Sequence, residues 1–367
     1  MPALLSIDVL LIAACAWLAI GLAGILSPRN LFYISKFLFP LGALIGVLAG
    51  LTSLSFLGST PETAVLVIGL PGLPFHLRLD NLAAVFVLLL GFASAGISIF
   101  AAGYFRKGEG TAPGLMCLQY HFFLASMLLV LLADDAYAFM VAWECMALSS
   151  FFLVTTDHRH AEIRRAGYLY LLIAHIGAIA ILLSFGVMTA GSGDYTFAGM
   201  RVQPHTPFWA SAAFLLALAG FGAKAGLLPL HVWLPEAHPA APSPVSAMMS
   251  GVMLKTAIYG LLRVSFDLLG EPLWWWGVVA MSIGLATAVF GVLYSTVQSD
   301  MKRLLAYSSI ENIGILYAGI GLTIARELAR FGGRLNIVWL DDLAFAEMRA
   351  RVAELPPRSA VLFVLLL

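Results

Sequence analysis

Long apolar stretches, separated by short polar connections, recur along almost the whole chain. A helix that crosses a lipid bilayer needs about 20 consecutive, mostly apolar residues. Stretches of this length occur ten times, at 7–26, 32–57, 80–103, 114–132, 135–155, 165–190, 208–228, 244–268, 273–297 and 303–324. The sequence therefore predicts an all-α polytopic membrane protein of about ten transmembrane helices.

Basic residues alternate between these connections. The first, third, fifth and ninth hold Arg29, Lys36, Arg106, Lys107, Arg159, Arg164, Arg165, Lys302 and Arg303. The second and sixth hold only Arg78 and Arg201, and acidic residues alone mark the fourth and eighth. Because cytoplasmic connections are enriched in Lys and Arg, we expect the basic connections inside the cell and the N-terminus outside.

Composition supports a lipid-facing surface and argues against several other classes. Hydrophobic residues make up 61% of the chain and charged residues 11%, against roughly 25% charged residues in soluble domains. The net charge is zero, so nothing favours nucleic acid as a partner. The three cysteines, Cys15, Cys117 and Cys145, have no metal-ligand spacing, and we predict neither a metal nor a cofactor in this chain.

The character of the chain changes abruptly after residue 324. Residues 325–360 carry six arginines and five acidic residues, and the apolar run at the end is too short to span a bilayer. We expect 325–367 to be an atypical charged tail, either disordered or the product of a truncated or frameshifted reading frame.

Two ionisable residues lie deep in the apolar runs, where such residues are costly and often functional. Glu144 lies within the predicted fifth helix and Lys224 within the seventh. The carboxylate indicates an ion path, or else a structural partner for a neighbouring helix. A lysine balanced between burial and a nearby anion can bind and release a proton. The alternative is a lysine that reaches the membrane surface.

Prolines crowd the segment after Lys224, at Pro229, Pro235, Pro239, Pro242 and Pro244. Proline removes a backbone donor and clashes with the preceding turn, so the seventh helix has to break near Lys224. Transporters place broken helices at ion sites, although an ordinary surface loop is the alternative. The next helix carries a second deep lysine, Lys255.

Three histidines accompany these lysines. His231 and His238 flank the break, and without a third ligand nearby a polar relay or a bond to freed carbonyls is favoured over metal binding. His175 lies alone in the sixth predicted helix. Packing against a polar neighbour and proton relay are equally open for this side chain.

Three segments carry a family resemblance. These are WECMALSSFFLV around Glu144, FGAKAGLLPLHVWLPEAHPAAPSPVSAMMSGVMLKTAIYGLLR over 221–263, and QSDMKRLLAYSSIENIGIL over 298–316. They resemble the antiporter-like subunits of respiratory complex I, of multisubunit sodium/proton antiporters and of membrane-bound hydrogenases. The segment SSIENIG is most similar to the hydrogenase branch of this family, that of hydrogenase 4 component B and formate hydrogenlyase subunit 3.

The resemblance implies a fold of two inverted five-helix repeats, each with one broken helix. Residues 1–79 would hold two N-terminal helices, and 80–324 the antiporter-like domain. Within that domain, 114–268 would form the first repeat and 273–324 the start of an incomplete second one.

The resemblance also implies roles for the deep residues. Glu144 would tune Lys224 electrostatically across the fifth and seventh helices, and Lys255 would be the next proton carrier. His231 and His238 would be polar positions on the central axis.

The implied function is proton translocation driven by redox chemistry in partner subunits. Other membrane subunits and a peripheral redox arm would then be partners, in a bacterial plasma membrane. A subunit of a sodium/proton antiporter without a redox partner, and a purely structural membrane anchor, are the alternatives.

Overall fold

The computed structural model describes residues 5–105 and 110–325, and within these ranges ten helices are long and apolar enough to cross a membrane. The spans are α1 (Ser6–Leu26), α2 (Leu31–Tyr33) with α3 (Phe39–Phe56), α4 (Asn81–Tyr104), α5 (Pro113–Leu132), α6 (Ala136–Val154), α7 (Ala161–Thr189), α9 (Pro207–Ala225) with α10 (Leu234–Ala240), α11 (Ser243–Met248) with α12 (Leu254–Leu262), α13 (Trp274–Thr296) and α14 (Met301–Ala325). The predicted all-α polytopic fold is confirmed, and the chain is a multi-pass membrane protein. The described residues do not include Arg106, Lys107 or the part of the predicted tail that follows Ala325.

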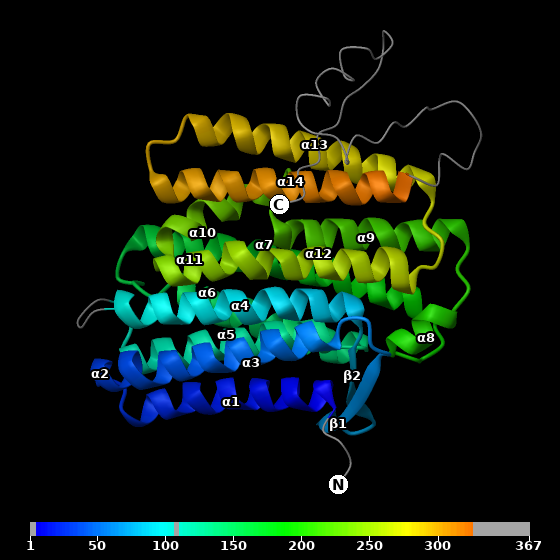
Figure 1. Cartoon of the computed structure of the whole chain (residues 1–367). Coiled ribbons are helices and arrows are strands. Elements are labelled where there is room, and N and C mark those ends of the chain that lie inside the picture. The colour runs from blue at the N-terminus through cyan, green and yellow to red at the C-terminus, as the bar shows by residue number, and fades with distance from the viewer. Residues whose placement is uncertain (1–4, 106–109, 326–367) are drawn as a thin grey trace, which may run out of the picture.

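The helices lie side by side, with their connections gathered at two ends of the bundle (Figure 1). One end, called the basic end below, holds the connections around Arg29, Arg159 and Lys302. The other, called the hairpin end, holds the strands β1 (Glu62–Leu70) and β2 (Leu73–Leu79) and the short helix α8 (Phe197–Val202). The alternation of basic connections along the sequence therefore corresponds to the two ends of the bundle.

Helix starts follow from side chains that satisfy free backbone donors. Asp80 accepts a hydrogen bond from the Ala83 amide at 2.9 Å to cap α4, and Asp135 does the same for Ala138 at 2.6 Å to cap α6. A capping carboxylate satisfies one of the unpaired amides of the first turn. Two polar residues at the membrane boundary thus fix where two of the spans begin.

The hairpin β1–β2 was not predicted. Its strands pair antiparallel from Glu62 opposite Leu79 to Leu70 opposite Leu73. A further backbone hydrogen bond joins the hairpin to the connection between α5 and α6, since the Asp134 amide donates to the His76 carbonyl at 2.8 Å. The hairpin therefore ties the connection between α3 and α4 to the start of α6.

Small residues allow the closest helix contacts. A Cβ added at Gly220 of α9 would lie 2.6 Å from the carbonyl oxygen of Gly177 in α7, and one added at Gly284 of α13 would lie 2.5 Å from the amide nitrogen of Ala318 in α14. Glycine at such positions lets backbones approach closely, as is common between membrane helices. The first contact fixes α9 against α7, which the candidate site requires.

The predicted break of the seventh span is observed. Helix α9 ends at Ala225, one residue after Lys224, and Gly226 follows with a φ of +86°. This left-handed conformation favours glycine, which has no Cβ. The chain then makes a short 3₁₀ turn over Leu230–Trp233 and resumes as α10.

Candidate functional site

Lys224 lies at the centre of the candidate site. Its side chain is in the last turn of α9 and is 2% exposed, so it does not reach the bundle surface. Nζ donates a hydrogen bond of 2.6 Å to Tyr170 Oη on α7. The same atom lies 4.9 Å from the centre of the Tyr170 ring and 5.8 Å from that of Trp143. Two aromatic rings and one hydroxyl therefore take the place of water around this ammonium group.

Tyr170 extends the contact beyond the lysine. Its hydroxyl lies 2.5 Å from Ser150 Oγ on α6, which itself donates to the Met146 carbonyl at 2.6 Å. The Trp233 ring packs on Tyr170 with centres 4.9 Å apart, and its indole donates to Ala223 O at 2.9 Å. Trp233 thus satisfies a carbonyl near the end of the broken helix and holds Tyr170 in place.

Glu144 does not contact Lys224 directly. Its carboxylate lies 3.5 Å from His175 Nε2 on α7, and the two side chains are 33% and 48% exposed at the bundle surface. His175 therefore packs against a polar neighbour, which was one of the two alternatives left open for this side chain. The tuning of Lys224 by Glu144 stays a prediction.

Lys255 lies on the next span and has a different environment. Nζ donates to the Ser250 carbonyl at 2.7 Å. This carbonyl belongs to a π-helical segment, Met249–Met253, between α11 and α12. Ser250 Oγ lies 2.7 Å from Ser309 Oγ of α14. A π-helical segment alters the backbone pairing of a helix and is frequent at functional sites.

The two histidines of the break differ in burial. His238, on α10, is 2% exposed, and its Nδ1 lies 2.8 Å from Ser246 Oγ. Its Nε2 has no hydrogen-bond partner among the residues described here. His231 is half-buried, and its ring centre lies 4.6 Å from that of Phe290. The two histidines therefore have different neighbours.

A cavity of about 290 Å³ opens at the basic end, beside the end of α10. Its lining includes Ala241, Asp157 and Lys302. Lys302 Nζ donates to the Ala241 carbonyl at 2.8 Å. Polar groups thus line an opening close to the segment that carries His238. Over 5–105 and 110–325, no group of three or more His, Cys, Asp and Glu side chains is placed to hold a metal ion.

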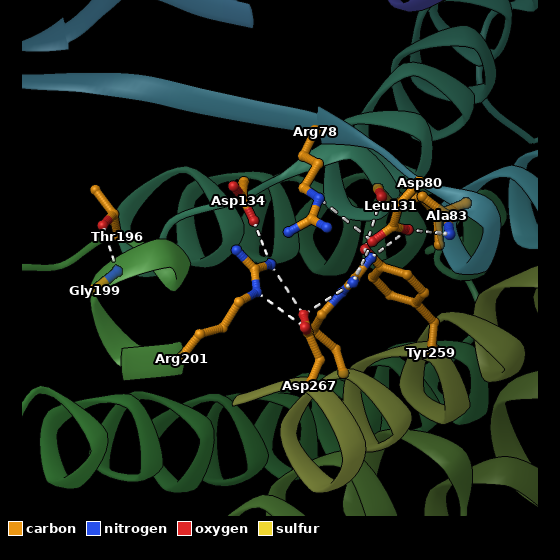
Figure 2. A network of polar contacts seen from close by, with 11 residues as sticks. Arg78, Asp80, Ala83, Leu131, Asp134, Thr196, Gly199, Arg201, Tyr259 and Asp267 are labelled. Carbon is orange, nitrogen blue, oxygen red and sulfur yellow. Dashed lines mark hydrogen bonds and ion pairs between the residues drawn. The ribbon is translucent and has the colours of Figure 1, made fainter. Parts of the chain in front are cut away.

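A second polar cluster, called the outer network below, lies at the hairpin end (Figure 2). It consists of three arginines and three aspartates: Arg78, Asp80, Asp134, Arg201, Arg263 and Asp267. Burial alone would raise the pKa of Asp80, but hydrogen bonds and charge from Arg263 hold it below its usual value. Burial would likewise lower the pKa of Arg201, but its bonds to Asp267 and Asp134 raise it. Of these six residues, only Arg78, Asp134 and Arg201 could be noted from the sequence, as charged residues in the connections between spans.

Comparison with known proteins places the chain in a family. The family model described as the transmembrane part of NADH:quinone oxidoreductase and Mrp antiporters matches residues 133–332. The chain belongs to this family. The matched region contains Glu144, Lys224 and Lys255, and the resemblance stated from the sequence is confirmed.

Relatives of this antiporter family include hydrogenase subunits. Hydrogenase-4 component B of Escherichia coli strain K12 is 46% identical over 251 residues, which cover 68% of this chain and 37% of that protein. Formate hydrogenlyase subunit 3 of the same strain is 30% identical over 249 residues, covering 67% and 39%.

The fold is shared with a solved member of the antiporter class. The structure of the Mrp complex from Dietzia sp. DQ12-45-1b aligns with a TM-score of 0.74 at 28% identity, covering 85% of this chain and 34% of that one. The chain thus spans less than two fifths of the length of each of these three relatives.

Proposed function

We propose that the chain is a proton-translocating subunit of a membrane-bound hydrogenase or NADH:quinone oxidoreductase-like complex. The observation that carries the proposal is Lys224, a buried lysine at the end of a broken helix, bonded to a tyrosine hydroxyl at 2.6 Å. An ammonium group without an adjacent carboxylate is costly inside a membrane. A change in its surroundings can therefore make it release a proton.

The proposed path uses the residues predicted from the sequence. Lys224 binds a proton while the Glu144 carboxylate stabilises its charge, and the paired His175 modulates that carboxylate. Loss of this stabilisation sends the proton toward Lys255. His231, in the 3₁₀ turn that follows the end of α9, and His238, on α10, supply polar positions between the two lysines. Protons enter from the basic end.

The remaining assignments follow from the same proposal. Residues 114–268 act as the first repeat and 273–324 as the beginning of the second. The basic end faces the cytoplasm of a bacterial cell and the N-terminus faces outward, as the distribution of Lys and Arg indicates. Partner membrane subunits and, through them, a peripheral redox arm supply the driving force.

A second candidate is a subunit of a multisubunit sodium/proton antiporter without a redox partner. The likeness to the Mrp complex, with a TM-score of 0.74, favours it. The higher identity of 46% to hydrogenase-4 component B favours the first candidate. Dependence of proton uptake on a redox substrate, compared with dependence on a sodium gradient, separates the two.

The test of the proposed function is the substitution Lys224→Arg in membrane vesicles that carry the chain with its partner subunits. Arginine keeps the positive charge but does not release a proton, so proton uptake should be lost while assembly and redox activity persist. Lys224→Ala should behave in the same way. Lys36→Arg, at an exposed lysine, is the matched control. Normal uptake by Lys224→Arg would favour the structural-anchor interpretation.

A further inference from the structure

Four polar side chains form a stripe along the span that carries Lys255. They follow one another at a spacing of four residues: Lys255, Tyr259, Arg263 and Asp267. Residues four apart share one face of an α-helix. Arg263 and Asp267 lie in a π-helical segment, Arg263–Leu268, and hydrogen bonds join Arg263 to both Tyr259 and Asp267. With a rise of 1.5 Å per residue, Arg263 lies about 12 Å from Lys255 along the axis. The stripe therefore runs from the second deep lysine to the hairpin end of the bundle.

Arg263 interrupts this stripe as a proton path. The Tyr259 hydroxyl donates to Leu131 O at 2.8 Å and accepts from Arg263 Nη2 at 3.0 Å. The donor to Tyr259 is therefore a guanidinium, which does not deprotonate in proteins. Lys255 bonds instead to Ser250, five residues back toward the basic end.

Arg263 is fixed in this position by two carboxylates. Its guanidinium forms a two-point contact with Asp80, at 2.6 Å from Nη1 to Oδ2 and 2.9 Å from Nη2 to Oδ1. Nη1 also donates to Asp267 at 3.0 Å, and the Arg263 side chain is only 5% exposed. Arg201 holds Asp267 from the other side at 2.9 Å (Figure 2). Paired contacts of this kind hold both partners rigidly.

We propose that Arg263 is a proton barrier that closes the hairpin end of the stripe. A fixed guanidinium excludes protons from a narrow polar passage by its charge, as arginine does in selective membrane pores. A proton on Lys255 then has no direct exit on this side of the membrane and has to leave by another route. The inference rests on the proposed function in one respect, that Lys255 carries protons.

The experiment measures passive proton leak, which needs no pumping. A pH gradient is imposed across sealed vesicles that carry the chain with its partner subunits, without redox substrate, and its decay is followed. Arg263→Gln should speed the decay tenfold or more. The double variant Asp80→Asn with Arg263→Gln also removes the carboxylate that would lose its partner in the single variant. It should leak as well. Arg201→Gln removes a guanidinium from the same network but off the stripe, and should stay tight.

Two further variants separate a barrier from general damage. Adding Lys255→Met to Arg263→Gln should return the leak to the wild-type rate, because the inner end of the route is then missing. Tyr259→Phe should leave both leak and redox-driven uptake unchanged, because Arg263 remains.

Three results would overturn the inference. The first is equal leak in the Arg201 and Arg263 variants at normal chain levels. The second is no leak in either Arg263 variant. The third is loss of uptake in Tyr259→Phe, which would make the stripe an outlet. The pH gradient is imposed without redox substrate, so the leak measurement does not depend on pumping. Its outcome is therefore independent of the Lys224→Arg test of the proposed function.

Discussion

Tyr170→Phe is the most direct test of how the candidate site controls Lys224. The substitution removes one oxygen and keeps the ring, so the packing on Trp233 and the ring contact with the ammonium group remain. What is lost is the 2.6 Å hydrogen bond from Lys224 Nζ and the 2.5 Å contact with Ser150.

The magnitude follows from the kind of bond. A hydrogen bond to a charged group contributes about 1.5–3 kcal/mol, more than a neutral one. Because each 1.4 kcal/mol is tenfold in an equilibrium, the balance between charged and neutral Lys224 should change by about ten- to a hundredfold. If proton transfer depends on that balance, the rate of redox-driven uptake should fall by about tenfold or more.

The assay is proton uptake into inverted membrane vesicles, with assembly and redox activity measured on the same sample. Tyr168→Phe is the matched control, since Tyr168 lies on the same helix but is 67% exposed. Uptake by Tyr170→Phe at the rate of this control would refute the idea that the Tyr170 hydroxyl sets the charge state of Lys224.

Further predictions concern tuning, orientation and packing. Glu144→Gln removes the carboxylate charge but keeps the side-chain shape, and should slow proton uptake several-fold without changing the amount of assembled complex. A reporter fused after Arg165 should be cytoplasmic and one fused near Asp194 external; the opposite labelling would reverse the proposed orientation. Gly284→Val would force α13 and α14 apart, at a cost of about 1–3 kcal/mol or more, seen as a lower unfolding temperature in detergent. Gly96→Val, whose added Cβ would have no atom of a neighbouring element within 4 Å, should leave that temperature nearly unchanged.

The ten spans could be predicted because lipid imposes a strong and simple demand. Each apolar run has to be about as long as a bilayer is thick, and its backbone has to be paired within the helix. The break after Lys224 could be predicted as well, because proline cannot continue a helix there. The hairpin β1–β2 was missed because Val65, Val67 and Ile68 continue an apolar pattern without crossing the membrane.

The contacts of the site were harder to predict, because they depend on how each helix is rotated. Glu144 and Lys224 were expected to interact, yet Tyr170 makes the direct bond and Glu144 lies against His175. A tyrosine in an apolar helix usually indicates packing alone, so nothing in its pattern marked Tyr170. Arg263 was likewise missed, since its partner Asp80 lies 183 residues away in sequence.

The π-helical segment Met249–Met253 has a consequence for how this span tolerates change. A π turn holds one residue more than the α-helical turn it replaces, and one residue in an α-helix corresponds to a rotation of about 100°. Deleting a single residue there would restore an ordinary α-helical turn and leave Lys255 and the residues after it facing the same neighbours. The same deletion within α12 would rotate every later side chain by about 100°. Related chains should therefore differ in length by one residue at Met249–Met253 more readily than at α12.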